Sequence, residues 1–145
     1  MDKLLNKLQV LLVNDLFQPF ANWIIQKFSI DSKINRPSFK EQEIWWCSFG
    51  HNIGDEENGK GDNFMRPVVI LRKYNKNLAL VAPTSTKLKD NQYYHTIEYE
   101  SQKYSVLISQ MKTIDTKRLQ KKIVSLSDND FQRLIQDIIR TIFKQ

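Results

Sequence analysis

The feature that most constrains this chain is a series of short apolar segments, rich in β-branched and aromatic residues and separated by polar turns. These segments are Glu43 to Phe49, Pro67 to Tyr74, Leu78 to Ala82, Tyr93 to Tyr99, Tyr104 to Ser109 and Lys122 to Leu126. Such side chains favour strands, and brief turns between strands of this length favour antiparallel pairing. The polar loops at 50–63 and 86–92 and the turn at 73–77 provide the connections. The sequence therefore predicts an antiparallel barrel or sandwich.

Helical periodicity flanks the strands on both sides. Apolar residues between Leu4 and Phe28 recur at helical spacing, with Pro19 expected to break or kink the run, which predicts one or two amphipathic helices. A second apolar stripe comprises Phe131, Leu134, Ile135, Ile138, Ile139 and Ile142, after a capping Ser127 or Asp128. The polar stretch 31–42 has no helical period. We therefore expect a helical extension and linker at residues 1–40 and a barrel domain with a C-terminal helix at 41–145.

Composition narrows the class of protein. The 145 residues suffice for one core plus an appendage. Lys and Arg number 22 against 16 Asp and Glu, so the net charge is +6, which favours polyanionic partners such as nucleic acid, although many equally basic proteins bind none. A single cysteine, Cys47, forms no internal disulfide and fits a core position in a reducing compartment. Polar residues interrupt the apolar N-terminal stretch too often for a signal peptide or a span, so we expect a cytoplasmic protein.

Candidate chemical groups are individually ambiguous. The glycine-rich loop 50–61 does not have the spacing of a P-loop, and its adjacent carboxylates, Asp55 to Glu57, point apart on a loop, so we expect neither a nucleotide cofactor nor a metal ion. Arg66 stands before Pro67, where an ordinary surface arginine at a strand end is the simpler interpretation. The hydroxyls of Thr84 and Ser85 are by themselves typical turn formers.

Taken together, these residues form a recognisable set. It comprises Ile53-Gly54-Asp55-Glu56, then Arg66-Pro67-Val68-Val69-Ile70-Leu71, Pro83-Thr84-Ser85, Ser109-Gln110, Thr113-Ile114-Asp115 and Arg118-Leu119. In order and approximate spacing this set resembles the MazF/PemK-like toxin family, over roughly residues 43 to 143. The resemblance implies an α+β, mainly β fold: a small, partly open antiparallel barrel of the CcdB/MazF-like plasmid maintenance toxin type.

The resemblance also implies a function. Members are dimeric toxins of type II toxin-antitoxin pairs that cleave single-stranded RNA, as mRNA interferases, without a metal or cofactor. The ribose 2′-hydroxyl attacks the adjacent phosphorus and leaves a 2′,3′-cyclic phosphate and a 5′-hydroxyl. By position, Arg66 matches the catalytic arginine, Thr84 the catalytic threonine and Glu56 the acidic residue of the first loop. Ser109 and Gln110 match the strand end that lines the same mouth.

The remaining polar and aromatic residues near the expected mouth are candidates for contact with RNA. The basic residues expected to neutralise phosphates are Lys60, Lys87, Arg72, Lys73 and Lys89, and Phe64 or Trp46 is expected to stack on bases. Ser85 and His51 are further expected substrate contacts. His51 is also an alternative to Glu56 as the group that transfers protons. The sequence departs from the family at two places. Lys60 to Met65 lengthens the first loop, and Lys112 stands where many members carry arginine.

Two alternatives stay open at this stage. A non-catalytic protein of the same fold would bind gyrase or nucleic acid, and would have no need to keep Arg66 and Thr84 in one pocket. The apolar extension, which the resemblance does not cover, either packs on its own barrel or lies in a dimer or antitoxin groove.

Overall fold

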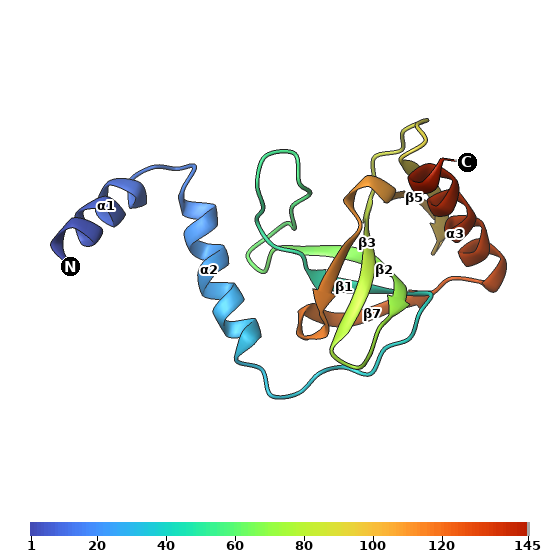
Figure 1. The fold of residues 1–145 in the computed structure, drawn as a ribbon, viewed down its shortest axis with the longest axis horizontal. Helices are drawn as coiled ribbons and strands as arrows, with labels where there is room; N and C mark the ends of the chain where they lie inside the picture. Colours follow the sequence, from blue (N-terminus) through green and yellow to red (C-terminus); the bar gives the residue numbers. More distant parts are fainter. Residues whose placement is uncertain (145) are drawn as a thin grey trace.

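The strand-forming segments pair into one antiparallel sheet of seven strands that curls into a partly open barrel (Figure 1). The computed structural model describes residues 1–144, so Gln145, the last residue of the expected barrel domain, lies outside it. The strands are β1 (Glu43–Ser48), β2 (Met65–Lys73), β3 (Leu78–Ser85), β4 (Tyr94–Tyr99), β5 (Gln102–Leu107), β6 (Lys112–Asp115) and β7 (Leu119–Ser125). Their order is β4-β5-β3-β2-β1-β7, and β6 pairs with β3. The expected mainly β fold is confirmed.

Some strand boundaries differ from those expected. β3 continues to Ser85, so Thr84 and Ser85 lie in a paired strand and not in a turn. β5 ends at Leu107, and Ser109 and Gln110 belong to a short 3-10 helix, η1 (Ile108–Gln110). β6, with four residues, was not expected from the sequence, and a second 3-10 helix, η2 (Thr116–Arg118), connects it to β7. Such short elements carry too little periodicity to be recognised.

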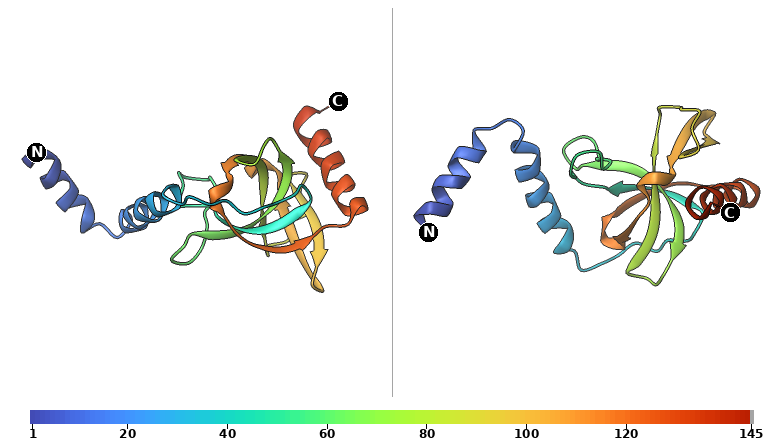
Figure 2. Two further views of the ribbon diagram at one scale, coloured as in Figure 1. Left: turned by 90° about the horizontal axis from the view of Figure 1, so that it is seen from below. Right: turned by 45° about the horizontal axis from the view of Figure 1, so that its top comes forward.

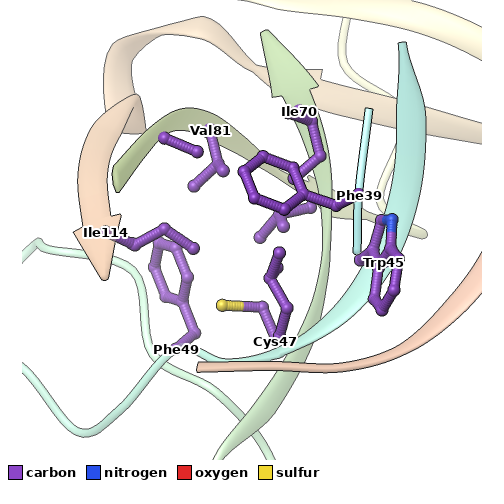
Figure 3. Packing of buried hydrophobic residues seen from close by; sticks show 10 residues of the cluster. Phe39, Trp45, Cys47, Phe49, Ile70, Val81 and Ile114 are labelled. Carbon is purple, nitrogen blue, oxygen red and sulfur yellow. The ribbon is translucent and has the colours of Figure 1, made fainter. Parts of the chain in front are cut away.

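Alternation along the strands buries both faces of the central sheet. Successive side chains of a strand point to opposite faces, so Trp45 and Cys47 of β1 join the barrel interior while Ile44 faces the other side. Figure 3 shows the interior cluster, which contains Phe39, Trp45, Cys47, Phe49, Val68, Ile70, Ala79, Val81, Ile114 and Leu119. Burial raises the pKa of the Cys47 thiol to about 12, which fits the expected core position.

The C-terminal helix α3 (Asp128–Phe143) covers the second apolar face, where Phe131 and Leu134 pack against β-sheet residues. The Ser127 hydroxyl accepts a hydrogen bond from the Asp130 amide at 3.1 Å and so caps the helix. His95 Nδ1 lies 2.5 Å from Asp137 Oδ2 and links β4 to α3. This contact gives His95 the structural role that a histidine in a strand ordinarily has.

The N-terminal extension forms two helices, α1 (Asp2–Leu12) and α2 (Gln18–Asp31), and Pro19 lies in the first turn of α2, where its missing N–H costs nothing. α2 packs on the barrel side through the buried Trp23 and Ile30, whereas α1 has no buried residue and stands clear of the barrel in every view (Figures 1 and 2). None of the helices within residues 1–144 is long and apolar enough to cross a membrane.

Candidate active site

Arg66, at the start of β2, is a buried cationic side chain with three polar partners. Its Nε donates to the Asn58 carbonyl at 2.6 Å and its Nη1 to the Thr84 carbonyl at 2.9 Å. Its Nη2 pairs with Glu57 Oε1 at 2.6 Å. A guanidinium has five N–H donors, so these contacts leave two of them free. The side chain is 8% exposed and its orientation is fixed by three partners from two elements.

A pocket of about 590 Å³ opens beside this guanidinium. It is lined by Trp46, Lys60, Gly61, Met65, Arg66, Pro67, Thr84, Ser85, Thr86, Tyr99, Glu100, Gln102, Tyr104 and Ile123. Trp46 alternates with the buried Trp45 on β1 and is 40% exposed, as expected if one tryptophan faces the core and its neighbour does not. Tyr99 and Tyr104, which also line the pocket, stack with ring centroids 4.2 Å apart. The pocket thus joins aromatic faces to a guanidinium and several hydroxyls.

Thr84 and Ser85 lie at the end of β3, in the wall of this pocket. The Thr84 side chain is 1% exposed, and its hydroxyl donates to the Pro67 carbonyl at 3.2 Å across the β2–β3 pair. The Ser85 hydroxyl accepts a hydrogen bond from the Lys87 amide at 3.1 Å, which leaves its own O–H free to donate. The structure therefore places the expected hydroxyls next to Arg66.

The carboxylate at Arg66 is that of Glu57 and not that of Glu56. Glu56 is exposed, and its Oε1 accepts a hydrogen bond from the Ile53 amide at 2.9 Å within the β1–β2 loop (residues 49–64). Spacing could not separate these neighbours, because a loop of altered length has no fixed register with Arg66. The ion pair between Glu57 and Arg66 is a contact that the sequence did not predict.

Gln110 supports the loop that carries Glu57. Its Oε1 accepts from the Glu57 amide at 3.0 Å, and its Nε2 donates to the Asp55 carbonyl at 3.0 Å. Gln110, the exposed Ser109 and Glu57 all line a separate, polar pocket behind the loop, and none of the three lines the pocket beside Arg66. In that pocket Lys112 donates to the Phe49 carbonyl at 3.2 Å, and burial, together with the nearby charge of Arg118, lowers the pKa of Lys112.

Two expected substrate contacts lie on the side of the loop that faces α2. Phe64 is 8% exposed and packs against Trp23, with ring centroids 5.4 Å apart. The His51 ring meets Phe20 edge to face at 4.4 Å. Neither side chain lines the pocket at Arg66, so the structure does not bring them together with the candidate catalytic group.

Of the basic residues expected to neutralise phosphates, only Lys60 lines the pocket beside Arg66 in the part of the chain that the structure describes. Lys87 is exposed in the segment after β3, where its carbonyl accepts a hydrogen bond from Ser105 Oγ at 2.8 Å. Within residues 1–144, no group of three or more His, Cys, Asp or Glu side chains is placed to hold a metal ion.

Comparison with known proteins shows which family and which solved structures the chain is similar to. The model of the family described as PemK-like, MazF-like toxin of type II toxin-antitoxin system matches residues 40–142. None of the curated proteins matches the sequence.

Solved structures share the fold at low sequence identity. MazF (Form-I) of Deinococcus radiodurans is 17% identical, with a TM-score of 0.59 over 75% of this chain and 98% of that one. The Mycobacterium tuberculosis toxin MazF-mt6 is also 17% identical, with a TM-score of 0.54 over 71% of this chain and 98% of that one. A mycobacterial endoribonuclease in complex with its cognate antitoxin is 7% identical, with a TM-score of 0.56 over 74% of this chain and 98% of that one. At these identities the likeness establishes the fold.

Proposed function

This chain belongs to the family of PemK-like, MazF-like toxins of type II toxin-antitoxin systems, and we propose that it is itself an endoribonuclease that cuts single-stranded RNA in the cytoplasm without a metal ion. The observation that carries the proposal is the buried Arg66, fixed beside Thr84 in the wall of a pocket large enough for a nucleotide. A protein that only binds a partner gains little from burying a guanidinium and orienting it at three points.

In the proposed reaction the ribose 2′-oxygen forms a bond to the adjacent phosphorus, and the bond from phosphorus to the 5′-oxygen breaks. The products are a 2′,3′-cyclic phosphate and a 5′-hydroxyl, so a base must take the proton of the 2′-hydroxyl and an acid must give one to the leaving oxygen. Negative charge grows on the non-bridging phosphoryl oxygens. The two free N–H groups of Arg66 suit that charge, because a guanidinium stays protonated and binds two oxygens at once.

Hydroxyl groups supply further hydrogen bonds. The Ser85 O–H is free to donate to a phosphoryl oxygen, while the Thr84 hydroxyl must rotate away from the Pro67 carbonyl to do so. Thr84 also fixes Arg66 through its main-chain carbonyl at 2.9 Å. We assign Thr84 to positioning Arg66 and to stabilising the transition state, and Ser85 to holding the substrate.

Glu57 replaces Glu56 as the proposed acid–base residue. Its carboxylate contacts Arg66 at 2.6 Å, and the ion pair uses Oε1. Glu56 points back into its own loop. A proton acceptor must lie within hydrogen-bond reach of the attacking group, and a group fixed to the guanidinium that holds the phosphate meets this condition better than one at the outside of the loop.

The pocket walls suit single-stranded RNA. Trp46 and Tyr104 offer aromatic faces on which unpaired bases stack, and the Lys60 ammonium neutralises phosphate. We further propose that the protein acts as a homodimer and is inhibited by a cognate antitoxin. The solved mycobacterial complex supports the antitoxin, since that relative of the fold is bound by one.

The proposal is tested by cleavage of a mixed-sequence fluorogenic RNA in excess EDTA. The native protein should cut, and Arg66→Ala and Thr84→Ala variants that keep the native circular dichroism spectrum should lose about a hundredfold or more in rate. If folded native protein binds RNA or gyrase and never cuts a broad RNA pool, it is a binding protein of this fold and the enzymatic proposal fails.

A matched pair of variants tests the assignment of the carboxylate. Glu57→Gln should lower the cleavage rate strongly, because its amide cannot accept the proton. Glu56→Gln, one residue away on the same loop, should keep the native cleavage rate. The opposite result would return the role to Glu56.

A further inference from the structure

The N-terminal helix α2 packs on the loop that carries the proposed catalytic carboxylate, although the family match begins only at residue 40. Trp23 of α2 is 7% exposed. Its indole lies against the backbone of Gly50 so closely that a Cβ on this glycine would be 2.7 Å from Trp23 Cζ2. The same indole meets the Phe64 ring at 5.4 Å between centroids. One turn earlier, Phe20 covers His51.

These contacts fall on both ends of the β1–β2 loop. The Phe64 carbonyl accepts hydrogen bonds from the amides of Phe49 and Gly50 at 2.8 and 3.2 Å, so the loop closes directly under the indole. Phe64 ends a tight turn in which Lys60 and Met65 exchange main-chain hydrogen bonds at 2.8 and 2.9 Å. Trp23 thus packs on Phe64, next to the residue at which this turn joins β2.

A short path leads from the indole to the guanidinium. The Gly59 amide donates to the Gly50 carbonyl at 2.8 Å. The residue before it, Asn58, accepts the Arg66 Nε hydrogen bond at 2.6 Å, and Glu57 forms the 2.6 Å ion pair. The Gly50 backbone on which Trp23 packs is thus hydrogen-bonded to the loop segment that holds Arg66 through Glu57 and Asn58. A shift of Gly50 would therefore displace the two loop partners of the guanidinium, Asn58 and Glu57, while the Thr84 carbonyl on β3 stays in place.

The position of the indole is itself fixed from the barrel. The Arg118 guanidinium lies 5.4 Å from the centre of the Trp23 ring, and its Nη1 donates to the Ser48 carbonyl at 3.2 Å. The end of α2 is held independently, because Lys117 Nζ donates to the Asp31 carbonyl at 2.8 Å. Loss of the indole therefore frees the loop while α2 keeps an attachment to the barrel.

We propose that Trp23 is a positioning residue for RNA cleavage, which holds the β1–β2 loop so that Glu57 and Asn58 keep Arg66 aimed into the pocket. This inference rests on the proposed function. It gives the N-terminal extension, which lies outside the family match over residues 40–142, a role in the reaction.

The test uses point variants of the full chain. Trp23→Ala should lower kcat for RNA cleavage about tenfold or more while KM changes less than about twofold, because the substrate-binding walls stay in place and the aim of Arg66 is lost. Trp23→Phe, which keeps an aromatic ring on Phe64, should recover most of kcat. Ile25→Ala, on the exposed side of the same helix, should behave as the native protein.

Hydrogen exchange separates this inference from the proposed function. In Trp23→Ala the Gly50 and Gly59 amides should exchange at least tenfold faster than in the native protein, while amides of the central strand β2 stay protected. This readout stands whether or not the native protein cuts RNA. The inference is overturned if amide exchange in the loop is unchanged in Trp23→Ala, or if the folded variant keeps the full kcat. If the native protein never cuts RNA but loop exchange is faster in Trp23→Ala, the indole holds the loop and its role in catalysis is overturned.

Discussion

Glu43 at the start of β1 is a carboxylate that is only 7% exposed and fully engaged with its neighbours. Its Oε2 accepts hydrogen bonds from the Trp45 indole at 2.7 Å and the Lys40 amide at 2.9 Å, and its Oε1 pairs with Lys122 at 3.0 Å. Burial alone would raise the pKa of Glu43, but these hydrogen bonds and the ammonium charge outweigh it and hold the pKa below its ordinary value of 4.5.

A pH dependence of stability follows from this lowered pKa. The carboxylate binds its proton less readily in the folded state than in the unfolded state, so its contribution is present above about pH 4.5 and is lost as the pH falls through the folded pKa. Glu43→Gln should therefore cost about 1–3 kcal/mol at pH 7 and flatten the loss of stability below pH 4.5. Urea unfolding at several pH values measures both effects. Glu98→Gln, on the exposed side of β4, is the control and should change neither.

Individual residues also show which parts of the candidate site could be predicted from the sequence and which could not. Arg66 and Thr84 were predicted as neighbours and lie together, because both belong to strands whose pairing fixes their separation. Glu56 and Phe64 belong to a loop whose path is not fixed by strand pairing, and the structure brings Glu57 to Arg66 and packs Phe64 against Trp23 instead. No local pattern reports which side of such a loop faces the barrel.

Among the secondary-structure elements, α3 was the most predictable, since its apolar stripe, its Ser127 cap and its charged ends all agree. The extension shows the limit of the same reasoning. Its periodicity predicted helices, which the structure contains, but not that α2 packs on the β1–β2 loop while α1 stays exposed. The proposed division between extension and barrel at residue 40 stays a prediction, and Phe39, 2% exposed in the interior cluster, ties the connecting segment firmly to the barrel.

The burial of α3 predicts an asymmetric response to truncation of its side chains. Leu134 is fully buried against the sheet, whereas Ile139 is 50% exposed on the same helix. Leu134→Ala should cost about 2–5 kcal/mol of unfolding free energy, since it removes buried methyl groups and leaves a cavity. Ile139→Ala should cost less than about 1 kcal/mol. Equilibrium unfolding in urea measures the two, and equal losses would contradict the placement of the helix.

At the scale of the whole molecule, the proposed function requires that the net charge of +6 and Lys60 in the wall of the pocket both attract RNA. Each phosphate that a cation neutralises releases counterions, so RNA affinity should fall linearly with salt on logarithmic axes, by about −0.7 per phosphate contact for a single strand. A 2′-O-methyl RNA, which lacks the attacking hydroxyl, allows this slope to be measured by fluorescence anisotropy without cleavage.

Local and global contributions of charge can then be separated. Lys60→Ala removes a cation that lines the pocket, so it should reduce the steepness of the salt dependence by about 0.7. Lys3→Ala removes the same charge from α1, which stands clear of the barrel, and should leave the slope unchanged although the net charge falls equally. Equal effects of both variants would mean that the overall charge attracts RNA without directing it to the pocket. Every exposed cation contributes to long-range attraction, whereas only cations close to a bound phosphate contribute to its contact.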